Sequence, residues 1–286
     1  MIAIHGLKYR MKAFQLHIER LELMTGLTLL VGKNGAGKSS LLKLLATACS
    51  PGEGQIIYDG YESKGHIPVV RSQIGYVPSH VELYGDMNPQ QFLQYFAQLK
   101  GIDTRSDKDP ITYWMERLEI DQYKHKKLKK CSLGMQHRVL FAQALLGRPR
   151  YILLDEPLNY LDQRERERMM DILSELSPNR LIVVASHELN EWARLASRII
   201  WLDQGEIRFE GSPQQWVMPC NKNIWEGWID LDQSFSCFEK EGLVSYREIG
   251  GRAHLVWIGQ EPPFSGLANK IPDWEEAYLV RSRIRI

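Results

Sequence analysis

A glycine-rich segment between two apolar runs limits the folds open to this chain. Residues 31–42 read V-G-K-N-G-A-G-K-S-S-L-L, with three glycines and two lysines in the loop. The run T-L-L-V at 28–31 predicts a buried strand, and the leucines that follow the loop recur at helical spacing. The segment therefore predicts a strand, a tight loop and a helix in that order.

This loop satisfies the pattern G-x-x-x-x-G-K-[ST] in the context that the pattern requires. Glycines allow backbone N–H groups to turn inward around phosphate oxygens, a lysine reaches the outer phosphates, and a hydroxyl can bind Mg²⁺. An ordinary glycine-rich turn is the alternative, and the flanking strand and helix disfavour it. The expected nucleotide-binding residues of the loop are Gly32, Asn34, Gly35, Gly37, Lys38, Ser39 and Ser40, with Ser39 also a metal ligand.

Two further apolar runs predict central strands of a mainly parallel sheet. They are Y-I-L-L at 151–154 and L-I-V-V-A at 181–185, and the first ends in Asp155 and Glu156. A carboxylate at the end of a buried strand can hold a metal beside the loop, so Asp155 is the predicted metal ligand. Glu156 is the predicted general base, or the residue that orients an attacking water. Many strands end in polar residues, so Asp155 and Glu156 indicate a nucleotide site only in combination with the glycine-rich loop.

The segment 131–138 reads C-S-L-G-M-Q-H-R and comes shortly before the D-E strand. Ser132 is placed as the N-cap of a helix, with Gly134 close behind it. The hydroxyl of Ser132, the backbone amides of the first turn and the helix dipole can together bind an anion there. An ordinary capped helix is the alternative reading, and the position before the D-E strand favours the anion site.

This order of motifs resembles the ATP-binding subunits of ABC transporters, whose signature sequence of the L-S-G-G-Q type precedes the D-E strand. The resemblance covers residues 1–212 and implies ATP and Mg²⁺ as cofactors. It implies that Ser132 and Gly134 contact the γ-phosphate of ATP held by a second ATPase subunit. Asp162, in N-Y-L-D, matches the loop that lines the dimer seam, and His187, in A-S-H-E, matches the switch histidine. Lys38, Glu156 and His187 are then the catalytic residues.

Some positions are ambiguous or depart from the family pattern. Tyr9 matches the aromatic residue that stacks on adenine, with Phe14 as a rival and a core aromatic as the alternative. Leu133 and Met135 depart from L-S-G-G-Q, but S-L-G-M is similar to the ABC-2 drug and bacteriocin exporters. Ser79 stands after I-G-Y-V-P, where the family usually has Gln, and a serine is too short to reach both metal and partner. We therefore expect slower or more partner-dependent hydrolysis.

The resemblance implies a P-loop NTPase of the ABC ATPase type, an α/β fold with N-terminal antiparallel strands, and the chain adds a small C-terminal α+β extension. Alternating apolar residues from Phe14 to Leu23 suggest half-buried strands. We expect an ATPase domain over 1–212, a helical subdomain over about 81–147 and an accessory domain over 213–286. In that last part, Gly250-Gly251 predicts a hairpin turn and P-D-W-E-E-A-Y-L predicts a short helix.

The predicted function is that of an ATP-hydrolysing subunit of a membrane ABC exporter. Its expected partners are an integral membrane permease and a second ATPase subunit, identical or related. Because the net charge of the chain is only +1, a nucleic-acid partner is not expected. The basic run K-H-K-K-L-K-K at 124–130 is best explained as a solvated surface. The four cysteines show no metal or disulfide pattern, which suits a reducing cytosol. The resemblance implies a cytoplasmic protein that is peripheral on the inner face of the cell membrane. A soluble ABC ATPase of cofactor assembly or nucleic-acid maintenance, and a regulatory ATP-binding subunit, are the alternatives.

Overall fold

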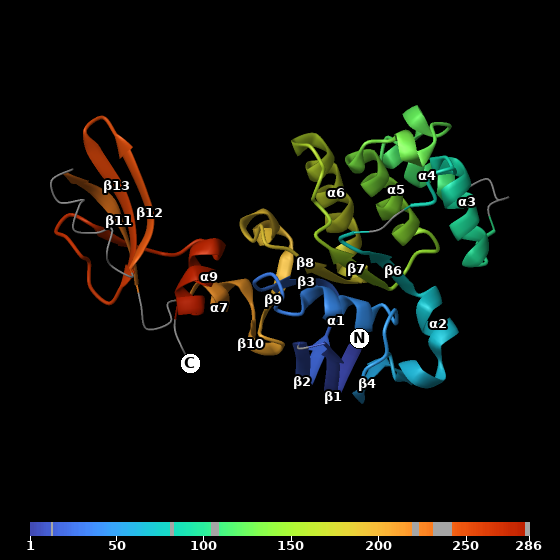
Figure 1. Cartoon of the computed structure of the whole chain (residues 1–286), viewed down its shortest axis with the longest axis horizontal. Helices are drawn as coiled ribbons and strands as arrows, with labels where there is room; N and C mark the ends of the chain where they lie inside the picture. Colours follow the sequence, from blue (N-terminus) through green and yellow to red (C-terminus); the bar gives the residue numbers. More distant parts are fainter. Residues whose placement is uncertain (13, 81–82, 104–108, 219–222, 231–241, 284–286) are drawn as a thin grey trace. The chain divides into compact units, whose positions relative to one another are not determined.

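The computed structural model describes the chain except residues 13, 81–82, 104–108, 219–222, 231–241 and 284–286. Contacts divide the chain into two compact units (Figure 1). Unit 1 comprises residues 1–187 and 195–210, and unit 2 comprises residues 188–194 and 211–286. Cys220 and Cys237 lie outside the described residues, while Cys49 and Cys131 are free thiols. The functional division at residue 212 stays a prediction.

A six-stranded sheet forms the centre of unit 1, in the order β10-β9-β3-β8-β7-β6. The pairs β6–β7, β7–β8, β8–β3 and β3–β9 are parallel, which confirms the mainly parallel core. Every residue of β7 and β8 is buried, as expected for strands covered on both faces. The strands are β3 (Gly26–Val31), β6 (Ile74–Val77), β7 (Tyr151–Asp155), β8 (Leu181–Ala185), β9 (Ala196–Asp203) and β10 (Glu206–Gly211).

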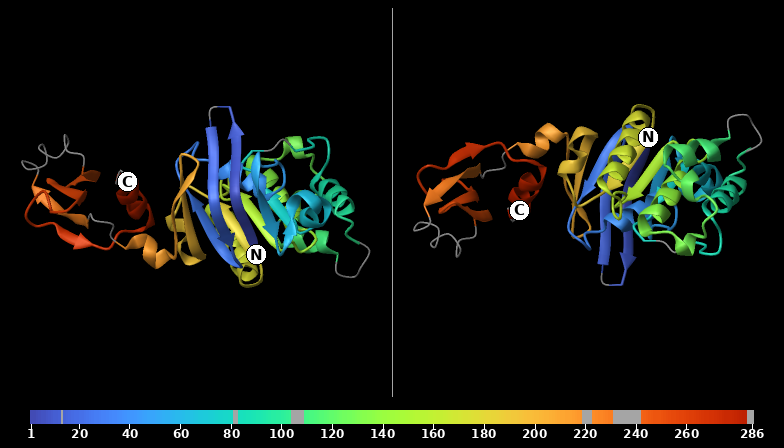
Figure 2. Two further views of the ribbon diagram at one scale, coloured as in Figure 1. Left: turned by 90° about the horizontal axis from the view of Figure 1, so that it is seen from below. Right: turned by 90° about the horizontal axis from the view of Figure 1, so that it is seen from above.

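An antiparallel sheet, β2-β1-β4-β5, packs beside this core and confirms the predicted N-terminal strands. The predicted strand segments between Phe14 and Leu23 form one strand, β2, which runs alongside β1 (Figure 2). Leucines of helix α1 share one apolar core with β1, β2, β7 and β8, so α1 lies between the two sheets. The elements are β1 (Ile2–Met11), β2 (Phe14–Leu23), α1 (Lys38–Leu45), β4 (Glu53–Tyr58) and β5 (Tyr61–Glu62).

Helices α3 (Pro89–Leu99), α4 (Pro110–Arg117) and α5 (Leu133–Leu145) lie between β6 and β7 in sequence and form the helical part of unit 1. Side-chain oxygens of Asn88 and Asp109 cap α3 and α4. Helix α5 packs closely on β6, because a Cβ at Gly75 would lie 2.1 Å from the carbonyl oxygen of Ala144. The remaining helices are α2 (Ile67–Ser72) and α6 (Gln163–Leu176), with short 3₁₀ turns at Ser63–Gly65, Asp121–Tyr123, Leu128–Lys130 and Ser177–Asn179.

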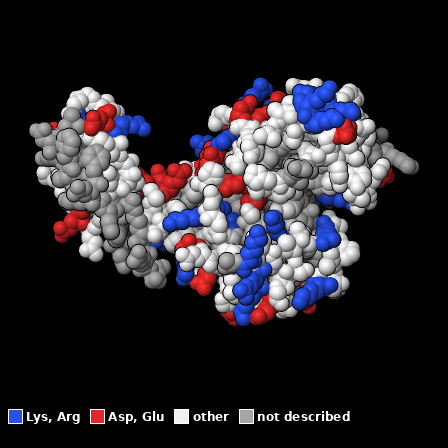
Figure 3. Space-filling model, in the orientation of Figure 1, with Lys and Arg blue, Asp and Glu red and all other residues white. Residues whose placement is uncertain are grey.

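Basic side chains gather on the surface between α4 and α5 (Figure 3). The lysines of the run 124–130 are exposed, and Lys129 pairs with Asp86 at 2.6 Å. Lys127 lies 3.6 Å from the same carboxylate. These contacts fit a solvated, partly neutralised surface.

Unit 2 contains an antiparallel sheet in the order β12-β13-β11-β14, flanked by two short helices. Ile249 pairs with Arg252 across Gly250 and Gly251, whose φ angles are 59° and 81°, so the predicted hairpin is confirmed. The predicted helix near the C-terminus is α9. The elements are α7 (Pro213–Val217), β11 (Asn223–Asp230), β12 (Leu243–Ile249), β13 (Arg252–Gly259), β14 (Ala268–Lys270), α9 (Trp274–Arg283) and a 3₁₀ turn, η5 (Asn190–Arg194).

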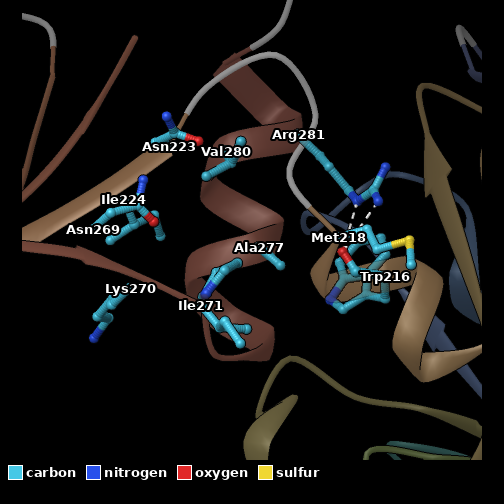
Figure 4. Close-up of a pocket in the computed structure, with 11 residues that line it drawn as sticks. Trp216, Met218, Asn223, Ile224, Asn269, Lys270, Ile271, Ala277, Val280 and Arg281 are labelled. Carbon is cyan, nitrogen blue, oxygen red and sulfur yellow. Dashed lines mark hydrogen bonds between the residues drawn. The ribbon is translucent and has the colours of Figure 1, made fainter. Parts of the chain in front are cut away.

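A cavity of about 80 Å³ lies inside unit 2 between α7, α9 and the sheet (Figure 4). Ile224, Ala277 and Val280 line it, and Arg281 turns back to donate to the carbonyl oxygen of Trp216. This volume has room for only a few water molecules. The cavity is therefore too small for a nucleotide.

Candidate functional site

The glycine-rich loop connects β3 to α1 and has the backbone of a phosphate cradle. Gly35 and Gly37 have φ angles of 82° and 109°, which favour glycine. A Cβ at Gly32 would lie 2.3 Å from the carbonyl oxygen of Leu202, so the loop can approach β9 only with glycine there. Helix α1 begins at Lys38, and its first-turn N–H groups therefore face the loop.

Lys38 is the buried cation of this loop, only 7% exposed. Its ammonium donates to the carbonyl oxygen of Gly32 at 2.7 Å. Burial lowers the pKa of Lys38, while the nearby carboxylates of Glu156 and Asp155 oppose that shift. The loop, the lysine and both predicted carboxylates therefore share one electrostatic environment.

Asp155 and Glu156 lie where β7 leaves the sheet. Asp155 is 2% exposed, and its Oδ2 has no hydrogen-bond partner among the described residues. Glu156 has a φ of 51°, a left-handed conformation that costs energy for a residue with a Cβ. Its N–H donates to the carbonyl oxygen of Ala185 at 2.9 Å, which holds the residue in this conformation.

His187 follows the neighbouring strand β8 and meets Glu156. The distance from Nδ1 of His187 to Oε2 of Glu156 is 2.9 Å. The glutamate side chain is 15% exposed and that of the histidine is 58% exposed, so the pair can be reached from solvent. The structure thus brings together Lys38, Asp155, Glu156 and His187, which are far apart in sequence.

The donor set at this edge of the sheet suits Mg²⁺. The buried, unpartnered carboxylate oxygen of Asp155 and the half-buried hydroxyl of Ser39 are hard oxygen donors. Within the described ranges, no group of three or more His, Cys, Asp and Glu residues forms a metal cluster. Mg²⁺ commonly takes only one or two protein ligands and completes its shell with phosphate and water.

The start of α5 is capped by Ser132 as predicted, and its role as an anion site stays a prediction. The hydroxyl of Ser132 accepts the N–H of Met135 at 3.2 Å. A Cβ at Gly134 would lie 2.6 Å from the carbonyl oxygen of Tyr160, so only glycine permits this contact. Leu133 is 59% exposed, which explains why leucine fits a position where the resemblance predicts glycine.

Asp162 begins α6 close to this segment. Its Oδ1 accepts the N–H of Glu165, and Oε2 of Glu165 accepts the N–H of Asp162. Glu165 also pairs with Arg138 of α5 at 2.9 Å, with both side chains largely buried. Ser132 and Asp162 therefore lie exposed on one connected surface, and the buried Gly134 packs against Tyr160 next to it. The capping box is readable as D-x-x-E, but the role of Arg138 was not predicted.

The two candidate adenine-stacking residues lie in different surroundings. Tyr9 is half-buried on β1 and packs against the main core. The main cause that raises the pKa of its hydroxyl is a side-chain hydrogen bond with Cys49. Phe14 lies against the glycine-rich loop, with Cζ 2.7 Å from the position of a Cβ at Gly37. The stacking role of Tyr9 stays a prediction. Ser79 is half-buried just after β6, the strand that pairs with β7.

Comparison with known proteins identifies the family. The sequence model described as "ABC transporter" matches residues 16–159, about half of the chain. The chain belongs to the ABC transporter family. The matched part is the ATP-binding domain of that family, so the protein is by class an ABC ATPase.

Relatives of this ABC ATPase extend the match to about 70% of the chain. It is 30% identical over 209 residues to the ABC transporter ATP-binding protein YxlF of Bacillus subtilis, covering 70% of this chain and 69% of the relative. It is 33% identical to the ABC transporter ATP-binding protein MJ1023 of Methanocaldococcus jannaschii, covering 70% and 71%. The solved dimeric cassette MJ0796 aligns with a TM-score of 0.66 and 25% identity, covering 74% of this chain and 98% of the cassette.

His137 is a buried ionisable residue in α5 of the ABC ATPase that the predicted chemistry does not use. It is 5% exposed, and within the described structure neither ring nitrogen has a hydrogen-bond partner. Its ring lies 6.3 Å from that of Tyr160, measured between centroids. Burial lowers the pKa of His137 from 6.5 to about 4, so the imidazole stays neutral in the folded protein.

We expect His137 to make folding less stable in mild acid. Between pH 6.5 and 4 the unfolded chain binds a proton here and the folded chain does not. The free energy of unfolding should fall by about 2 kcal/mol between pH 7 and 5 from this residue alone. His137→Met should remove that part of the pH dependence in urea unfolding, whereas the exposed His125→Ala should not. Equal pH slopes for wild type and His137→Met would contradict this account.

Proposed function

We propose that this protein is the ATP-binding and hydrolysing subunit of a membrane ABC exporter. The observation that carries the proposal is the meeting of Lys38, Asp155, Glu156 and His187 where β3, β7 and β8 end. These residues supply the charges that phosphoryl transfer to water requires. Family membership supplies the transporter context, and S-L-G-M together with the resemblance to ABC-2 ATPases supports export.

The side chains divide the hydrolysis reaction between them. The ammonium of Lys38 neutralises the outer phosphates, and the loop N–H groups bind the phosphate oxygens. Glu156 orients the attacking water and accepts its proton, while His187 holds the glutamate carboxylate and reaches the γ-phosphate. Ser39 and Asp155 would hold Mg²⁺, which would supply positive charge beside the phosphate oxygens.

Each ATP is shared between two subunits in this proposal. The surface of Ser132, Gly134 and Asp162 closes over ATP held by the loop of the partner, which is a second copy or a related subunit. Exposed Ser132 and Asp162 on one connected surface support this arrangement. A related cassette was solved as a dimer in a post-hydrolysis state bound to ADP and Pi.

A membrane permease completes the transporter in this proposal. No helix in the described part of the chain is long and apolar enough to cross a bilayer. A cavity of about 480 Å³ lies between α3, α5 and β6 and reaches Pro78, the residue before Ser79. Pro78, Tyr84 and Phe92 are among its lining residues, and Tyr84 is 53% exposed. Such a partly open, mainly apolar cavity suits a helix end of the permease, and it would hold the protein at the inner face of the cell membrane.

Replacing the predicted general base should trap the closed dimer. We expect Glu156→Gln to lower ATP turnover at least about 100-fold while leaving ATP bound. With ATP and Mg²⁺, light scattering should give twice the subunit mass. Lys38→Ala, which weakens phosphate binding, should stay monomeric under the same conditions. A Glu156→Gln protein that stays monomeric even with its permease would overturn the shared-ATP arrangement.

Ser79 should limit the rate of hydrolysis. We expect Ser79→Gln to raise the basal ATPase rate several-fold, because the longer amide reaches the metal or its water beside Asp155. The exposed neighbour His80 provides a matched control, since His80→Gln adds the same amide one residue further on. Unchanged basal and permease-stimulated rates in Ser79→Gln would refute the expectation.

Purification from detergent-solubilised host membranes tests the transporter assignment. Mass spectrometry of the tagged chain should recover a protein with several membrane spans. We expect Tyr84→Glu, which puts a charge into the cavity, to lose that protein. Tyr113→Glu alters another exposed tyrosine, 49% exposed, and should retain it. Recovery of soluble proteins alone would favour a soluble ABC ATPase instead.

A further inference from the structure

The segment directly after His187 folds with unit 2 and not with the ATPase unit. Residues 188–194 belong by their contacts to unit 2, whereas His187 belongs to unit 1. Leu189 is 4% exposed and Trp192 is fully buried, so this segment is packed. The chain therefore passes from a site residue into the second unit within a few positions.

Asn190 makes a side-chain contact that ties this segment to helix α9. Its Oδ1 accepts the N–H of Trp274 at 3.0 Å, across 84 positions of sequence. Trp274 opens helix α9, where backbone N–H groups lack partners within the helix. Asp273 meanwhile accepts the N–H of Glu276 at 2.8 Å. Asn190 thus acts as a second cap for α9, supplied from a distant segment.

The helix that Asn190 caps is itself firmly held inside unit 2. The Nε1–H group of Trp216 donates a hydrogen bond of 3.0 Å to the carbonyl oxygen of Trp274, and Trp216 is fully buried. Arg281 lies over the ring of Trp216 at 5.0 Å and donates to the carbonyl oxygen of Gln215. Lys270 pairs with Glu276 at 2.8 Å, which ties β14 to α9. Asn190 is therefore anchored to a packed structure.

We propose that Asn190 is a positioning residue for His187, and that unit 2 controls ATP hydrolysis through this contact. The His187 side chain is 58% exposed, so its place depends largely on its backbone. Asn190 stands three positions later, with buried Leu189 between them. A displacement of about 1 Å would break the 2.9 Å contact between His187 and Glu156. This inference rests on the role proposed above for His187.

Three variants of the full-length protein test the contact. Asn190→Ala removes the acceptor, and we expect kcat to fall about five-fold with the KM for ATP unchanged. Asn190→Asp keeps an acceptor and adds a favourable charge at the helix N-terminus, so its kcat should stay near wild type. Tyr246→Phe removes a different side-chain hydrogen bond of unit 2, to Glu248, and should leave kcat unchanged.

A double-mutant cycle separates positioning from a general structural effect. In a His187→Ala background, Asn190→Ala should cause no further loss of kcat, because the residue that it positions is absent. Independent, multiplying losses would overturn positioning through His187, as would wild-type kcat in Asn190→Ala alone. If His187→Ala itself left kcat unchanged, the role of His187 in the proposed function would fail, and the inference with it.

Discussion

The common edge at which β3, β7 and β8 end is the constraint on which the ATPase unit depends. Strand β8 pairs in parallel with both β3 and β7, so the chain leaves all three at the same side of the sheet. The glycine-rich loop, the carboxylates of Asp155 and Glu156, and His187 are delivered there by three separate segments. A slip of one residue in β7 would turn Asp155 to the opposite face, so strand register sets the geometry of the site.

Polar groups are buried at this edge, and the described residues supply only part of the hydrogen-bond and charge partners that these groups can use. Lys38 bonds to a carbonyl of its own loop, and one oxygen of Asp155 lacks a partner among the described residues. Glu156 is held in a left-handed conformation by its N–H bond to Ala185. Energy stored in unsatisfied and strained groups can be released when phosphate oxygens and a cation bind. In the proposed function, the same features that cost stability prepare the site for nucleotide.

Local features of the fold and of the site were predictable because their causes are local. The loop pattern, the cap at Ser132 and the Gly250-Gly251 turn each depend on a few consecutive residues. Contacts between distant segments were not predictable from one sequence. The pair of Arg138 with Glu165, and the bond of Asn190 with Trp274, depend on how helices pack, and no periodicity encodes that packing. The positive φ of Glu156 likewise arises from its neighbour strand and not from its residue type.

Unit 2 is connected to unit 1 at more than one point of the chain, which distinguishes it from a domain appended at one end. An appendage is joined once, but this chain enters unit 2 after His187, returns to unit 1 at Leu195, and enters unit 2 again after Glu210. The first of these passages follows a residue bonded to Glu156. Coupling between two sites is reciprocal in free energy. If the position of α9 affects the contact of His187 with Glu156, then ATP binding at that contact must in turn change how strongly Asn190 holds α9.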